Sequence, residues 1–220
     1  MKRALVIGHR GGIGAALAAA LNTKGFAVTG LGRAEGFDLT QPDTIAASLG
    51  ALDGPFDVVV MATGILAPPG GQPEKRLAAV TADGMAQVMA VNAIGPALVL
   101  GQVARLLPKA SRAVVMVLSA RVGSIGDNDL GGWHSYRASK AALNMILRGA
   151  AIEMVRSHPQ AICVALHPGT VATPFTAGYA GRHPTVAPAV AAEHLLAVID
   201  GLTPADTGSF RDWRGDVVAW

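Results

Sequence analysis

The first residues of the chain contain the feature that most restricts its fold. An apolar run, Ala4 to Ile7, ends at a glycine-rich turn, Gly8-His9-Arg10-Gly11-Gly12-Ile13-Gly14, which leads into a stretch of strong helix formers. A strand, a glycine turn and a helix in this order can place a diphosphate at the helix N-terminus. Gly8 permits a tight turn, Gly12 lets the backbone approach a pyrophosphate, and Gly14 lets helix and strand pack closely. On this motif alone, a glycine-rich turn without a ligand stays open as the alternative.

Short apolar, β-rich runs recur along the chain and alternate with helix-forming stretches. We expect strands at residues 4–7, 25–31, 56–61, 113–118 and 162–166, and helices over 43–49, from about 81 to 107, and over 141–147. Strands that alternate with helices throughout predict a parallel, doubly wound sheet. The expected fold is therefore a Rossmann-type α/β/α sandwich of three layers, with residues 1–220 forming a single NAD(P)-binding domain.

The composition excludes several other classes of protein. Hydrophobic residues make up 51% of the 220 residues and charged residues 15%, which is typical of a globular chain. The net charge is only +3 and the basic residues are scattered, so we expect neither a nucleic-acid partner nor a membrane partner. No apolar run suits a signal peptide or a membrane span, and the six histidines lack metal-ligand spacing. We therefore expect a cytoplasmic protein without a metal site.

Two arginines bear on the choice of cofactor in a dinucleotide fold. The second strand ends at Gly32-Arg33, where such a fold meets the adenosine ribose. An acidic residue here would accept a hydrogen bond from the 2′-hydroxyl, whereas Arg33 attracts a 2′-phosphate. Arg10, in the glycine turn, can reach the same phosphate. The pattern predicts NADP(H) in preference to NAD(H).

A tyrosine and a lysine lie at helical spacing before the apolar run 141–147. Tyr136 and Lys140 are four residues apart, so on a helix they share one face. A free phenol has a pKa of about 10, and a fixed ammonium beside it favours the phenolate. The pair is a candidate proton donor, although the same spacing often marks only a solvated face.

Taken together, these motifs resemble those of the short-chain dehydrogenase/reductase family. The shared features are Gly8-x-x-x-Gly12-Ile13-Gly14, Asn92 within its helix, Tyr136-x-x-x-Lys140, and Pro168-Gly169-x-Val171-x-Thr173. The likeness covers essentially the whole chain. The stretches 123–140 and 208–213 look like its small C-factor-like carbonyl reductase branch.

The resemblance implies a role for each matching residue. Tyr136 would exchange a proton with the substrate, Lys140 would lower the Tyr136 pKa and bind the nicotinamide ribose, and Asn92 would hold a water in a proton relay. The remaining residues implied to bind the cofactor are Gly8, Arg10, Gly12, Ile13, Gly14, Arg33, Asp38, Leu39, Ala62, Thr63, Gly64, Pro168, Gly169, Val171 and Thr173. The family also implies a homodimer or homotetramer.

Two positions depart from the family pattern. The stretch after the strand 56–61 reads Met61-Ala62-Thr63-Gly64 in place of Asn-Asn-Ala-Gly. The serine that holds the substrate carbonyl oxygen is replaced by Ala120. Ser119 would point to the opposite face of an extended strand. Ser124 is a possible substitute, although a loop serine more often bonds its own backbone.

The sequence therefore favours an NADP(H)-dependent carbonyl reductase or alcohol dehydrogenase acting on a small molecule. Segment 174–188, rich in Gly and Pro, is expected to form a short lid over the substrate. Ala120 keeps a second hypothesis open, a nucleotide-binding protein with little turnover that acts in regulation or signalling.

Overall fold

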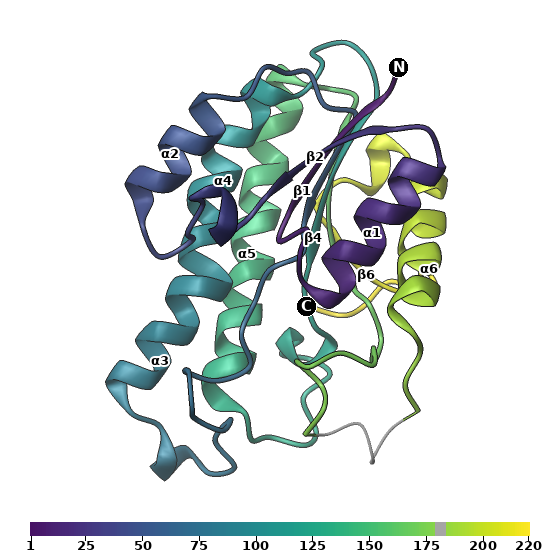
Figure 1. The fold of residues 1–220 in the computed structure, drawn as a ribbon. Coiled ribbons are helices and arrows are strands. Elements are labelled where there is room, and N and C mark those ends of the chain that lie inside the picture. Colours follow the sequence, from purple (N-terminus) through teal and green to yellow (C-terminus); the bar gives the residue numbers. More distant parts are fainter. Residues whose placement is uncertain (179–183) are drawn as a thin grey trace.

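The computed structural model describes residues 1–178 and 184–220 and contains one parallel sheet between two layers of helices (Figure 1). The strands are β1 (Arg3–Ile7), β2 (Ala27–Leu31), β3 (Val58–Met61), β4 (Ala113–Leu118), β5 (Ala161–His167) and β6 (Ser209–Asp212), in the spatial order β2-β1-β3-β4-β5-β6. Every neighbouring pair is parallel. The predicted doubly wound, Rossmann-type sheet is confirmed.

The helices are α1 (Gly12–Thr23), α2 (Pro42–Gly50), α3 (Ala82–Met89), α4 (Gly95–Val103), α5 (His134–Ser157) and α6 (Pro188–Gly201). Short 3-10 turns lie at Arg33–Glu35, Leu77–Ala79, Ala104–Leu106, Arg121–Gly123 and Pro204–Asp206. Helices α2, α3, α4 and α5 cover one face of the sheet, and α1 and α6 cover the other (Figure 1).

Strand β1 shows why both faces of the sheet need a cover. Leu5 and Ile7 belong to the core cluster under α2, α4 and α5, whereas Ala4 and Val6 belong to the cluster under α1 and α6. Successive side chains of a strand point to opposite faces. A run that is apolar at every position is therefore buried on both sides, as in other parallel sheets.

The predicted helix from about 81 to 107 is one continuous helical stretch with a defect. A π-helical turn, Ala90–Ile94, separates α3 from α4 and contains Asn92. Pro96 has no N–H, so the carbonyl of Asn92 loses its α-helical donor at this point. Such π-bulges are frequent at functional sites.

The same stretch, Ala82–Leu106, is long and apolar enough by length and composition to cross a membrane. This corrects the expectation that no segment reaches that length. In the fold it lies in the helical layer, where it packs against α2 and α5. The last helix and strand, α6 and β6, were not predicted from the sequence.

Candidate active site

The glycine turn lies at the carboxyl end of β1 and requires glycine at three positions. Gly8 has φ +85°, and a Cβ there would lie 2.6 Å from the carbonyl oxygen of Ala62. A Cβ on Gly14 would lie 2.1 Å from the Gly8 oxygen, and one on Gly12 would lie 2.6 Å from Cγ2 of Thr173. The turn is therefore packed as closely as the dinucleotide motif requires.

Helix α1 starts at Gly12 without a side-chain cap and with no acidic residue in its first turn. Its first N–H groups thus lack an intrahelical partner and a local carboxylate, which leaves them suited to an anion. The residues present fit the diphosphate of a dinucleotide cofactor.

The adenosine end of the expected cofactor site contains a residue that the sequence reasoning missed. Arg10 lies beside the carboxylate of Glu35, with Nη2 2.6 Å from Oε1, and His9 Nε2 lies 3.7 Å from the same oxygen. Arg33 stands in the same 3-10 turn as Glu35. No motif marks Glu35, because the chain brings it to the glycine turn only by folding.

Asp38 and Leu39 lie between β2 and α2. The Asp38 carboxylate accepts 2.8 Å hydrogen bonds from the backbone N–H and the hydroxyl of Thr40, which lower its pKa. Leu39 is buried, and its side chain leaves no room for a Cβ on Gly95. This segment is therefore held by its own turn and by the start of α4.

The turn after β3, Ala62-Thr63-Gly64, is tied to α5 through Asn92. The Asn92 amide donates to the carbonyl of Ile65 at 2.8 Å and to the hydroxyl of Ser139 at 3.0 Å, and its Oδ1 accepts from the Ile65 N–H at 2.8 Å. A Cβ on Gly64 would lie 3.2 Å from Asn92 Oδ1 and 3.5 Å from Lys140 Nζ. All hydrogen-bonding atoms of the buried amide are thus used to fix this loop.

Tyr136 and Lys140 lie one turn apart near the start of α5, as their spacing predicts. Their exposed fractions are only 6% and 3%. Lys140 Nζ lies 6.0 Å from the centre of the Tyr136 ring and donates to the carbonyl of Leu118 at 2.9 Å. The structure thus brings the two side chains together with Asn92 in one buried cluster.

The electrostatics of this pair differ from the sequence expectation. Burial raises the pKa of the Tyr136 phenol above its ordinary value and lowers the pKa of Lys140 to about 8. The expected lowering of the phenol pKa by Lys140 is therefore wrong for this structure, because desolvation outweighs an ammonium at this distance. Tyr136 carries its proton at neutral pH.

Two aromatic rings flank Tyr136. Trp133 meets it edge-on with ring centres 6.2 Å apart, and Phe175 lies tilted at 6.0 Å. Trp133 has φ 52°, an uncommon conformation for a residue other than glycine. The backbone N–H of Trp133 donates to the carbonyl of Glu74. The Glu74 carboxylate in turn accepts hydrogen bonds from the backbone N–H and the hydroxyl of Ser135. Glu74 thus holds the start of α5 from a loop far away in the sequence.

Three positions bear on the serine that the family pattern would have here: Ala120, Ser119 and Ser124. Ala120 follows β4 and presents only a methyl group. The Ser119 hydroxyl donates to Oδ1 of Asn144 at 2.7 Å, and the Ser124 hydroxyl accepts from the N–H of Asp127 at 3.1 Å. The Ser119 proton is thus used by Asn144, whereas the Ser124 oxygen serves as the acceptor of a turn and its O–H is still a donor.

The segment after β5 completes the edge of the site. Gly169 has φ +77°, and a Cβ there would lie 3.0 Å from the indole of Trp213. Val171 is buried and pairs with Val186, and Thr173 contacts the glycine turn at Gly12. Pro168, Gly169, Val171 and Thr173 therefore lie at the carboxyl end of the sheet with the other predicted site residues.

The predicted lid, 174–188, is described only at its two ends, and Tyr179 and Arg182 lie outside the described residues. A cavity of about 500 Å³ lies against its first part. It is lined by Gln72, Pro73, Glu74, Lys75, Ala79, Trp133 and Gly178.

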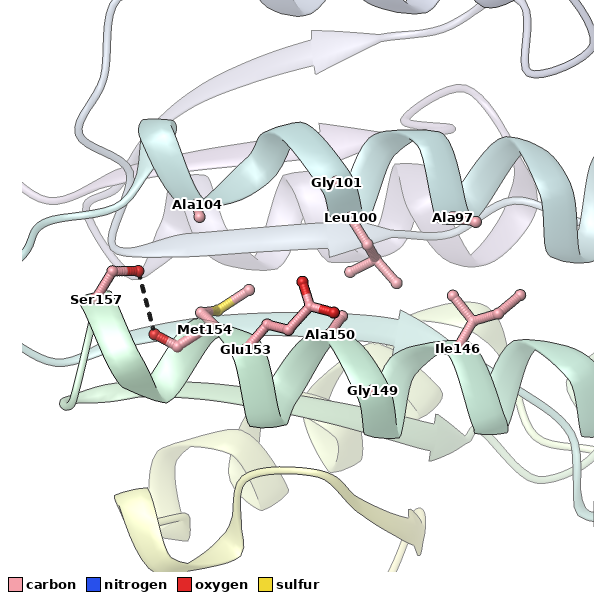
Figure 2. Close-up of a pocket in the computed structure, with 10 residues that line it drawn as sticks. All are labelled: Ala97, Leu100, Gly101, Ala104, Ile146, Gly149, Ala150, Glu153, Met154 and Ser157. Carbon is pink, nitrogen blue, oxygen red and sulfur yellow. Dashed lines mark hydrogen bonds between the residues drawn. The ribbon is translucent and has the colours of Figure 1, made fainter.

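A second cavity, of about 380 Å³, lies between α4 and α5, and Tyr136 is not among the residues that line it (Figure 2). Leu100 and Ile146 point toward each other across it. Gly101 and Gly149 also line the cavity and have no side chain to fill it (Figure 2). The exposed side chains of Met145 and Ile152 lie on the same helix, α5.

The family of the chain follows from comparison with known proteins. The family model described as Enoyl-(Acyl carrier protein) reductase matches residues 33–209. The chain belongs to the short-chain dehydrogenase/reductase family. Its sequence is 38% identical over 130 residues to the 1-hydroxy-2-glutathionyl-2-methyl-3-butene dehydrogenase of Rhodococcus sp. (strain AD45), covering 59% of this chain and 56% of that protein. It is 35% identical over 137 residues to the C-signal protein of Myxococcus xanthus, covering 62% and 78%.

Among solved structures, the chain is similar to a short-chain dehydrogenase/reductase from Burkholderia multivorans with bound NADP. The TM-score is 0.79 and the identity 25%, with 100% of this chain and 99% of that chain covered. The aligned part of this chain spans about half the length of the Rhodococcus relative. Membership of this family supports an oxidoreductase that acts on a small molecule.

Proposed function

We propose that the chain is an NADP(H)-dependent oxidoreductase that interconverts a carbonyl and a hydroxyl group, with Tyr136 as general acid and base. The observation that carries this proposal is the buried pair of Tyr136 and Lys140 at the carboxyl end of the sheet, beside an uncapped glycine turn. A turn that only binds nucleotides has no physical need for this pair. The NADP bound by the Burkholderia relative supports the choice of cofactor.

When bound, the nicotinamide cofactor supplies hydride in the direction of reduction and accepts it in oxidation. Tyr136 donates its proton to the carbonyl oxygen, because a phenol is protonated at neutral pH even at its ordinary pKa of about 10, and burial raises that pKa further. Lys140 binds the nicotinamide ribose and keeps positive charge near the phenolate that forms. The Asn92 side chain holds the loop at Ile65, and its main-chain carbonyl is free of an α-helical donor and available to a relay water.

The proposed cofactor contacts follow the strand ends. Gly8, Gly12, Ile13 and Gly14 would bind the diphosphate, and Arg10 and Arg33 the 2′-phosphate. The other proposed contacts are Asp38, Leu39, Ala62, Thr63, Gly64, Pro168, Gly169, Val171 and Thr173. The rings of Trp133 and Phe175 favour a substrate with an apolar group next to its carbonyl.

A second function is favoured by one observation: Ala120 offers no hydrogen-bond donor, and the hydroxyl of the adjacent Ser119 already donates to Asn144. Without such a donor, turnover falls, and the chain would serve as a nucleotide-binding regulatory or signalling protein. We place the enzyme first, because Asn92, Tyr136 and Lys140 are all present. We further propose a cytoplasmic homodimer or homotetramer, with contacts through α4 and α5.

The test of the first function is a screen of ketones, aldehydes and quinones with NADPH, followed at its near-ultraviolet absorbance. On the best substrate, Tyr136→Phe should abolish turnover and leave the dissociation constant for NADP⁺ within about twofold, because Phe preserves the ring but not the acid. An unchanged thermal midpoint controls for folding. Retained turnover in Tyr136→Phe would remove this residue from the mechanism, and a screen without any substrate would favour the regulatory function.

A further inference from the structure

Glu35 occupies the space of a missing side chain at the end of β2. The chain is extended at Gly32 and then makes the 3-10 turn Arg33–Glu35, closed by Gly36 in the left-handed conformation. The turn folds Glu35 back over the strand end, and its Oε2 lies 3.3 Å from where a Cβ on Gly32 would be. The carboxylate thus lies directly beside the point from which a side chain at position 32 would start.

This position has a defined meaning in dinucleotide folds. A carboxylate at the end of the second strand accepts a hydrogen bond from the ribose 2′-hydroxyl and repels a 2′-phosphate. Gly32 has no side chain, so the sequence alone indicates a site for the phosphate. The structure restores a carboxylate to that space from three residues further along the chain.

The carboxylate is also paired with a cation that the phosphate would need. Arg10 Nη2 lies 2.6 Å from Glu35 Oε1, a charge-assisted contact. The Arg10 side chain is 67% exposed and can turn, whereas the Glu35 side chain is 27% exposed and packs against Gly32 and His9. Among the ion pairs of the described residues, Arg33 takes part in none.

We propose that Glu35 determines cofactor specificity, competing with the 2′-phosphate for Arg10 and accepting a hydrogen bond from the 2′-hydroxyl. The site therefore accepts both NADP(H) and NAD(H), with a preference for NADP(H) that Glu35 limits. This inference rests on the proposed function for the presence of a dinucleotide. Glu35 is then the residue that sets the choice between NADP(H) and NAD(H).

The experiment measures dissociation constants for NADP⁺ and NAD⁺ by isothermal titration calorimetry, without any substrate. Glu35→Gln should tighten NADP⁺ binding roughly tenfold, because a carboxylate close to a doubly charged phosphate is removed. The same variant should weaken NAD⁺ binding severalfold, so the ratio of the two constants rises in favour of NADP⁺. Asp53→Asn, an exposed carboxylate before β3, controls for the change in net charge and should leave both constants unchanged.

A Glu35→Gln change made in the Arg10→Ala variant separates two effects of Glu35. One is its competition with the 2′-phosphate for Arg10, and the other is direct repulsion between the carboxylate and the phosphate. If Glu35 competes for Arg10, Glu35→Gln should tighten NADP⁺ less in Arg10→Ala than in the wild type. An unchanged ratio of the NADP⁺ and NAD⁺ constants in Glu35→Gln overturns this inference but leaves the proposed function intact, provided that the wild type binds NADP⁺. A wild type that binds neither dinucleotide overturns both.

Discussion

At the scale of single residues, the hydrogen bonds of two serine hydroxyl groups near Ala120 decide which of them could donate to a substrate carbonyl oxygen. Ser119 donates to Asn144, and Ser124 accepts from the backbone at Asp127. The O–H of Ser124 is not used in that bond, whereas Ala120 itself offers no donor to a carbonyl oxygen. The loss of one donor to a developing oxyanion typically costs about 10² to 10³ in rate. Tyr136 would then act without a helper.

We therefore predict that Ala120→Ser raises kcat/KM about tenfold or more on the best substrate, because it restores the missing donor. Ser124→Ala should change kcat/KM less than about threefold, since its hydroxyl serves a turn. Steady-state kinetics with NADPH measure both. A large loss in Ser124→Ala with no gain in Ala120→Ser would show that Ser124 is the substitute donor.

Lys140 gives a prediction on stability. Burial lowers its pKa from an ordinary 10.5 to about 8, so between these pH values the unfolded chain binds one more proton than the folded chain. The free energy of unfolding should therefore rise with pH across this window, and below pH 8 the cost of the buried ammonium is constant.

Replacing the ammonium should remove this cost. Lys140→Met should be more stable than the wild type at pH 7, by up to about 3 kcal/mol, and the difference should shrink toward pH 10.5. Urea unfolding from pH 7 to pH 10.5 measures it. A difference that stays constant with pH would contradict a buried, desolvated Lys140.

At the scale of elements, helix α5 depends on a residue outside it. It carries Tyr136 and Lys140, but Trp133 before it has no side-chain cap to offer. Glu74 supplies the missing acceptor to Ser135. Desolvation would raise the Glu74 pKa, yet the hydrogen bonds from Ser135 outweigh it, and the pKa is lowered. The carboxylate is thus in place at neutral pH.

Glu74→Ala should destabilise the protein by about 1 kcal/mol, as the loss of a helix cap does. It should also lower kcat, because Tyr136 follows Ser135 directly. Glu74→Gln, which keeps one acceptor oxygen, should recover part of both effects. Urea unfolding and kcat are measured on the three proteins. Full activity in Glu74→Ala would mean that the cap does not position Tyr136.

At the scale of the whole molecule, exposed apolar side chains occur on the π-turn, α4 and α5. Ile94 is 55% exposed, Leu98 37%, Met145 72% and Ile152 50%. The cavity with Gly101 and Gly149 lies between the same two helices (Figure 2). Small residues let another helix approach closely, so these features support the oligomer that we propose to form through α4 and α5.

Met145→Glu should therefore shift the protein toward a monomer, because a charge at a covered apolar position is costly. Leu77→Glu, at a residue that is 71% exposed outside these helices, is the matched control and should not change the assembly. Light scattering after size-exclusion chromatography gives the mass of each. A wild type that is monomeric at micromolar concentration would refute the oligomer.

The sequence by itself determined the pattern of strands and helices apart from α6 and β6, and the spacing of Tyr136 and Lys140. These features are local: continuous apolar runs form β1, β3, β4 and β5, and Tyr136 and Lys140, four positions apart, share one face of any helix. Strand β6 escaped prediction because three of its four residues, Ser209–Asp212, are polar, and the segment becomes a strand only by pairing with β5.

Only the tertiary structure decided the chemistry around those motifs. Glu35 reaches Gly32 through a bend in the chain, and Glu74 caps α5 from a loop 61 residues before Ser135. The phenol pKa of Tyr136 is raised, against the sequence expectation, because burial outweighs the lysine beside it. Desolvation and contacts between distant residues arise from packing, and no local pattern in the sequence encodes them.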